Sequence, residues 1–135
     1  MPKMVYSLYS NMYIERKILY VGSAERDLQK LPDEIREEFA LGLILAVQGK
    51  KHLRAKPFKL FGGNSILEIV ADDRSGTYRA VYTIRFAEAV YVLHVFQKKS
   101  KKGIKTPKQD VWLIEERFKR AEQDYKTRFK NNEKK

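Results

Sequence analysis

An arginine within a predicted strand is the first residue of this sequence that is suited to chemistry on an anion. The alternating pattern over 77–85 predicts a strand with Arg79, Val81, Thr83 and Arg85 on one face and Tyr78, Ala80, Tyr82 and Ile84 on the other. An arginine in the middle of a central strand needs either a carboxylate partner or an anionic ligand over the sheet. Glu68 is the nearest candidate partner. The two interpretations are compatible, and the sequence leaves both open.

A lysine-rich segment supplies the second candidate group. Lys98 and Lys99 end a predicted strand, and Lys101, Lys102 and Lys105 follow them on the way to a predicted helix. Lysines together with the N–H groups and dipole of a helix N-terminus attract phosphate. We therefore predict phosphate contacts here, with an ordinary solvated loop as the alternative.

Cleavage of RNA by its own 2′-OH requires a proton acceptor, cationic support for the phosphorane and a proton donor for the leaving oxygen. Neighbouring cations lower the pKa of a lysine, so Lys98 and Lys99 are candidates for proton transfer as well as for charge stabilisation. Tyr82, Glu68 and His94 are the other candidates. His94 lies in an apolar strand, where a hydrogen-bonded core histidine is the more common case.

The composition indicates a polyanionic partner. Twenty-eight Lys and Arg against 17 Asp and Glu give a formal charge of +11. Acidic residues are absent between Glu38 and Glu68 and between Glu88 and Asp110, so the basic residues, Lys56 and Lys59 among them, form a separate zone. The alternative is a charge that serves only solubility.

Several classes of protein are disfavoured. There is no cysteine and there are only two histidines, and no P-loop, Rossmann or Gly-x-Ser-x-Gly pattern occurs. We therefore expect neither a metal nor a cofactor. The first twenty residues are broken by charges, which predicts a soluble, cytoplasmic chain without a membrane span.

The secondary-structure elements that must position these residues are predicted from the spacing of apolar residues and from the Ser, Pro and Gly residues that begin or end helices and strands. A strand over 17–21 is followed by a helix capped by Ser23 and stopped by Pro32, then by a second helix from Asp33 to Gly49, which together form an αα-hairpin. After a surface loop over 50–65, strands over 66–71, 77–85 and 90–97 form an antiparallel meander.

The last predicted helix begins at Thr106-Pro107 and carries an apolar stripe that lies against the sheet or a partner. We predict an α+β fold in which helices cover one face of an antiparallel sheet and leave the other partly open. We expect residues 1–16 to form an N-terminal extension, 17–128 a single domain and 129–135 a frayed tail.

From about Lys17 to Ala121 the sequence resembles the phage-derived branch of the RelE/HigB toxin family. The motifs that carry the resemblance are the Leu-Glu of 67–68, the Tyr-Arg-x-x-Tyr of 78–82, the Leu-His-x-Phe-x-Lys-Lys of 93–99 and the Thr-Pro of 106–107. The resemblance implies a RelE-like fold and the toxin of a type II toxin–antitoxin module, a metal-independent endoribonuclease that cleaves mRNA on the ribosome. It also implies a cognate helix-turn-helix antitoxin encoded beside it. The expected assemblies are a toxin homodimer or a toxin–antitoxin heterotetramer.

The resemblance places the family's sheet arginine at Arg79 and its paired lysines at Lys98 and Lys99. The surrounding basic residues are expected to bind RNA, namely Lys56, Lys59, Arg85, Lys101, Lys102 and Lys105. Two alternatives remain open, because fold does not determine function: a ParE-like gyrase inhibitor and a non-catalytic, phage-derived nucleic-acid-binding protein. The basic loop over 98–105 favours RNA.

Overall fold

The computed structural model describes residues 16–58, 65–98 and 106–133. Within these ranges the elements follow the order β1 (Lys17–Tyr20), α2 (Ala24–Gln29), α3 (Asp33–Val47), β2 (Ala55–Pro57), β3 (Ile66–Asp73), β4 (Gly76–Thr83), β5 (Ala89–Lys98) and α4 (Lys108–Glu133). The predicted α+β class is confirmed. The bounds of the three meander strands lie within two residues of the predicted ones. The short polar turn of Arg74 and Ser75 separates β3 from β4.

The sheet has the strand order β1-β5-β4-β3-β2. Strands β3, β4 and β5 pair antiparallel, as predicted. The prediction of a purely antiparallel sheet is wrong, because β1 pairs parallel with β5, from Lys17 opposite Ala89 to Tyr20 opposite Val92. No turn connects these two strands directly, so their relative direction depends on the route of the whole chain between them.

The segment predicted to be a surface loop contains the short edge strand β2. Its Ala55, Lys56 and Pro57 pair with Ile69, Glu68 and Leu67 of β3. A proline lacks the N–H of a ladder hydrogen bond and is tolerated at the edge of a sheet. The pairing places Lys56 directly across from Glu68.

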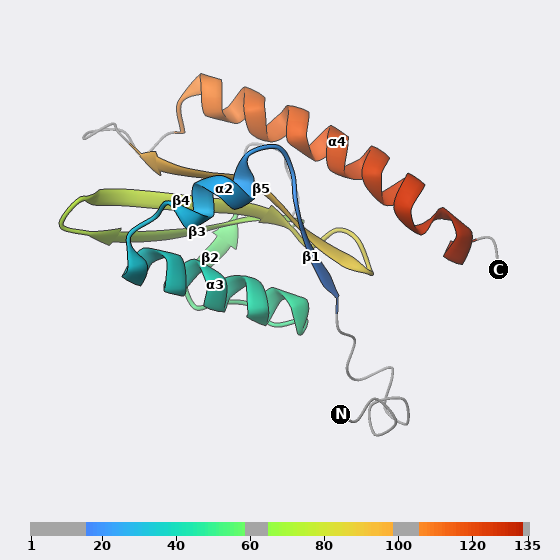
Figure 1. Ribbon diagram of the computed structural model, residues 1–135, viewed down its shortest axis with the longest axis horizontal. Coiled ribbons are helices and arrows are strands. Elements are labelled where there is room, and N and C mark those ends of the chain that lie inside the picture. The colour runs from blue at the N-terminus through green and yellow to red at the C-terminus, as the bar shows by residue number, and fades with distance from the viewer. Residues whose placement is uncertain (1–15, 59–64, 99–105, 134–135) are drawn as a thin grey trace.

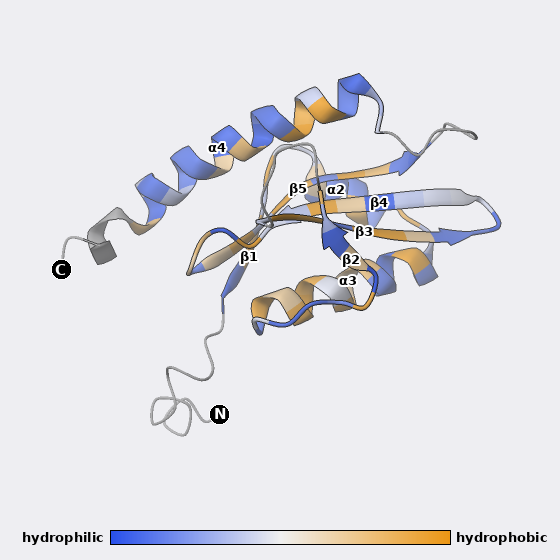
Figure 2. Ribbon diagram, turned by 180° about the vertical axis from the view of Figure 1, so that it is seen from behind, coloured by the Kyte–Doolittle hydropathy of each residue, from blue (hydrophilic) through white to orange (hydrophobic). Residues whose placement is uncertain are grey.

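Helices cover both faces of the sheet, whereas the sequence predicted coverage of one face only. The αα-hairpin of α2 and α3 packs on one face and α4 on the other (Figure 1). Phe39 of α3 and Tyr82 of β4 belong to the first core, and Ile114 of α4 and Leu93 of β5 to the second. Most of α4 is hydrophilic, while the strands beneath it carry long hydrophobic stretches (Figure 2).

The last helix is also longer than predicted. It continues through Glu133 instead of ending at Arg128. Phe129 is buried and its ring lies 4.7 Å from that of Tyr125, so the packing of aromatic side chains extends the helix along the segment expected to fray. At the start of α3, Pro32 and not Asp33 occupies the N-cap position.

Candidate active site

A β-bulge in β5 decides which side chains face α4. Val81 pairs with His94, but the next residue, Tyr82, pairs with Val92, so Leu93 is an extra residue in β5. Leu93 packs in the core under α4, and His94 contacts α4 through hydrogen bonds. The bulge therefore turns His94 and the following alternate residues, Phe96 and Lys98, to the face that carries Arg79.

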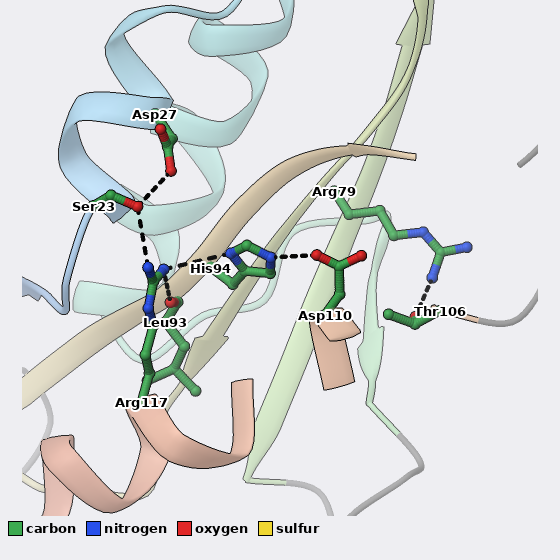
Figure 3. A network of polar contacts seen from close by, with 8 residues as sticks. All are labelled: Ser23, Asp27, Arg79, Leu93, His94, Thr106, Asp110 and Arg117. Atoms are coloured by element: carbon green, nitrogen blue, oxygen red, sulfur yellow. Dashed lines mark hydrogen bonds and ion pairs between the residues drawn. The ribbon is translucent and has the colours of Figure 1, made fainter. Parts of the chain in front are cut away.

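Arg79 and Glu68 form a buried ion pair on this face. The side chains are 7% and 9% exposed, and Arg79 Nη1 lies 3.0 Å from Glu68 Oε1. The same Nη1 donates to Thr106 Oγ1 at 3.1 Å, just before α4 begins (Figure 3). The carboxylate partner predicted for Arg79 is thus present. An anionic ligand on the same guanidinium stays a prediction.

Lys98 completes a cationic cluster that we define as Lys56, Arg79 and Lys98 around Glu68. Desolvation lowers the pKa of Lys98, and the positive charges of Arg79 and Lys56 lower it further, while Glu68 acts in the opposite direction. Lys98 is partly exposed to solvent. Its ammonium group therefore gives up a proton more readily than that of an isolated lysine, and this suits Lys98 to donate a proton to an alkoxide.

His94 is held between two residues of α4 (Figure 3). Its Nε2 lies 2.7 Å from Asp110 Oδ1, and its Nδ1 lies 3.4 Å from Arg117 Nη1. A guanidinium only donates, so Nδ1 accepts and the ring proton resides on Nε2, which donates to the Asp110 carboxylate. Burial lowers the pKa of His94 and outweighs the opposing effect of Asp110, which favours this neutral ring.

Arg117 connects three elements. It donates to the carbonyl oxygen of Leu93 at 2.9 Å and to Ser23 Oγ at 3.1 Å, and the Ser23 hydroxyl donates to Asp27 Oδ2 at 2.7 Å. The hydroxyl of Ser23 therefore serves this network and makes no capping hydrogen bond to α2. The network fixes α4 against β5 and against the start of α2.

Tyr82 lies on the other face of the sheet. It is fully buried in the core under α2 and α3, and burial raises the pKa of its phenol to about 12. The sheet separates Tyr82 from Arg79, as the alternation of the strand predicted. We leave Tyr82 out of the candidate proton-transfer groups.

The predicted RNA-binding residues are only partly covered by the structure. Lys56 is exposed beside Glu68. Arg85 lies beyond the end of β4, where it pairs with Glu122 at 3.3 Å, apart from the cationic cluster. The other predicted RNA-binding residues, Lys59, Lys101, Lys102 and Lys105, lie outside the described residues, as does the predicted catalytic residue Lys99.

Sequence reasoning missed Phe96, Asp110 and Arg117. The His94 and Phe96 rings stack with centroids 4.4 Å apart, on the strand opposite Arg79. Asp110 and Arg117 lie seven residues apart on α4, so two helical turns bring them to the same side. The seven-residue spacing is visible in the sequence. Only the packing of α4 over the bulge shows that both side chains contact His94.

Two further observations concern the described part of the chain. No three His, Cys, Asp or Glu side chains within it lie close enough together to hold a metal ion. None of its helices has an apolar stretch long enough to cross a membrane.

The chain matches one family of proteins and is similar to two solved toxin structures. Residues 26–119 match the family of phage-derived Gp49-like proteins (DUF891). A mutant of the Escherichia coli toxin RelE in the free state has 23% identity and a TM-score of 0.47, over 66% of this chain and 90% of that one. A chain of the toxin–antitoxin complex RelBE2 from Mycobacterium tuberculosis has 23% identity and a TM-score of 0.42, over 64% and 95%. No curated protein matches in sequence.

Proposed function

Because the chain belongs to the family of phage-derived Gp49-like proteins, we propose that it is the toxin of a type II toxin–antitoxin module and cleaves mRNA on the ribosome. The observation that carries the proposal is the cationic cluster of Lys56, Arg79 and Lys98 around Glu68. It lies on the same side of the sheet as the N-terminus of α4, and Thr106, two residues before that helix, contacts Arg79.

The cluster suits the chemistry of RNA cleavage. Attack of a 2′-OH on the adjacent phosphorus builds negative charge on the phosphoryl oxygens, and fixed cations stabilise that charge. Arg79 is held in place by Glu68 and Thr106, so little reorganisation is needed to receive a phosphate. Lys98, with its lowered pKa, is suited to protonate the leaving 5′-oxygen.

The charge of the chain supports both proposed partners. A formal charge of +11 favours ribosomal RNA and mRNA, and the same cationic surface suits an acidic segment of an antitoxin. Neutralisation of the cationic cluster by that segment would also silence the toxin. We therefore include a cognate antitoxin in the proposal.

The test is cleavage of mRNA on purified translating ribosomes, followed by mapping of the new 5′ ends. Wild-type protein should cut within the translated frame. Arg79→Ala should lower the cleavage rate by about 100-fold or more, because removal of one preorganised hydrogen-bond donor to the transition state typically costs about that much in rate. Arg26→Ala is the charge-matched control, since Arg26 is exposed on α2, on the other side of the sheet.

The alternatives give different results in cells. Growth arrest with new cuts in mRNA, relieved by co-expression of the antitoxin, supports the proposal. Arrest with intact mRNA and impaired DNA supercoiling would replace it with gyrase inhibition. RNA binding without cleavage or arrest would replace it with a non-catalytic binding protein.

A further inference from the structure

Asp110 is a carboxylate fixed at the N-terminus of α4. Its Oδ1 accepts the hydrogen bond of His94 Nε2 at 2.7 Å, and its side chain is 25% exposed. Among the described residues, His94 is its only polar partner. One carboxylate oxygen is therefore held in position (Figure 3), while part of the side chain remains accessible to solvent.

Two sets of contacts fix the position of Asp110 relative to the cationic cluster. Thr106, four residues earlier and just before α4, accepts a hydrogen bond from Arg79 at 3.1 Å. His94 stacks on Phe96, which is paired across the sheet with Arg79. Asp110 thus borders the place where the cluster would hold a phosphate.

The other candidate proton acceptors are already engaged. Both ring nitrogens of His94 have partners, Asp110 and Arg117. Glu68 is ion-paired with Arg79 and is only 9% exposed. Tyr82 is buried on the opposite face. Asp110 alone among these acidic or basic groups combines exposure with a fixed orientation.

Building on the proposed RNA cleavage, we propose that Asp110 accepts the proton of the attacking 2′-OH, and that His94 and Arg117 are positioning residues for it. The O2′–P bond forms as the proton passes to the carboxylate, and the P–O5′ bond breaks as Lys98 protonates the leaving oxygen. The products are a 2′,3′-cyclic phosphate and a 5′-hydroxyl. Proton exchange with water then restores both side chains.

Asp110→Asn separates this role from a structural one. The amide oxygen of asparagine still accepts the His94 hydrogen bond, but an amide is not a proton acceptor at neutral pH. The variant should keep the wild-type denaturation midpoint and ribosome affinity, and should cleave about 100-fold or more slowly, as expected for loss of a general base. Glu34→Gln removes the same charge from an exposed position on α3, on the other side of the sheet, and should retain the wild-type rate.

Asp110→Ala gives a second and independent readout. It leaves space for a small carboxylate beside His94, so added sodium formate should restore part of the cleavage rate, whereas sodium chloride at the same ionic strength should not. Formate should not rescue Asp110→Asn, in which the amide fills that space. For the positioning role, His94→Leu should lower kcat at unchanged KM, and His94→Gln, whose amide can donate to Asp110, should restore part of it.

The proposed function and this inference fail in different ways. Wild-type protein that leaves mRNA intact on ribosomes refutes the proposed function and the inference with it. Wild-type protein that cleaves, together with Asp110→Asn that cleaves within about fivefold of its rate, refutes the inference alone. A folded, ribosome-bound Asp110→Ala variant that formate leaves inactive also overturns it.

Discussion

Substitution of Gly22 by alanine tests the contact between Arg117 and the start of α2. Gly22 has a φ of 59°, which an L side chain adopts at a cost, and an added Cβ would lie 2.8 Å from Arg117 Nε. Gly49 is the matched control. Its φ is 78°, but a Cβ there has no neighbour within 4 Å. The two substitutions share backbone strain and differ in crowding of the guanidinium.

The expected losses of unfolding free energy follow from the backbone strain and from the crowding of the Arg117 guanidinium. Backbone strain alone should lower the free energy of unfolding of Gly49→Ala by about 1 kcal/mol. Gly22→Ala adds displacement of a guanidinium that donates to Leu93 O and Ser23 Oγ, and leaving one buried group unpaired costs about 1–3 kcal/mol. Its total should therefore be about 2–4 kcal/mol on the same reasoning.

Urea denaturation followed by circular dichroism measures both variants, and a double-mutant cycle with Arg117→Met isolates the crowding. Without the guanidinium, Gly22→Ala should cost only the backbone strain of about 1 kcal/mol. Equal costs for Gly22→Ala and Gly49→Ala, or a cost of Gly22→Ala that persists in the Arg117→Met background, would refute the reasoning.

Three other predictions concern single side chains. Burial lowers the pKa of His94, so the unfolded chain binds its proton first as the pH falls below about 6.5. The urea midpoint should therefore fall on acidification from pH 7.5 to 5, and it should fall less in His94→Gln; an equal fall in both proteins would contradict the assignment of a buried neutral ring. Tyr82→Phe removes a buried hydroxyl that has no hydrogen-bond partner in the described structure, so stability should rise by up to about 1 kcal/mol with cleavage unchanged, and a marked loss of cleavage would return Tyr82 to the active site. Lys98→Ala should reduce the slope of log affinity for the ribosome against log salt by about 0.7–0.9, and an unchanged slope would show that Lys98 contacts no phosphate.

The sequence was sufficient where the signal is local. Strand alternation places Arg79 on one face of β4 and Tyr82 on the other, and the structure retains that separation. Pro32 and Gly49 delimit the second helix of the hairpin to within two residues, since both act on the backbone beside them. Glu68 was identified as the carboxylate nearest to Arg79, and the buried ion pair confirms it.

Long-range pairing decided the rest. The parallel direction of β1, the bulge that turns His94 towards α4, and the hydrogen bond between Arg117 and Ser23, 94 residues apart, depend on contacts between distant segments. A bulge changes the face of every residue after it. The alternation of residue types along one strand does not show where that strand holds an extra residue relative to its partner. The sequence by itself therefore determined the helices and the four longer strands, the basic charge, and Glu68 as the candidate partner of Arg79. Only the tertiary structure brought Asp110 of α4 to His94 of β5, because that contact exists only when the helix packs over the bulged strand.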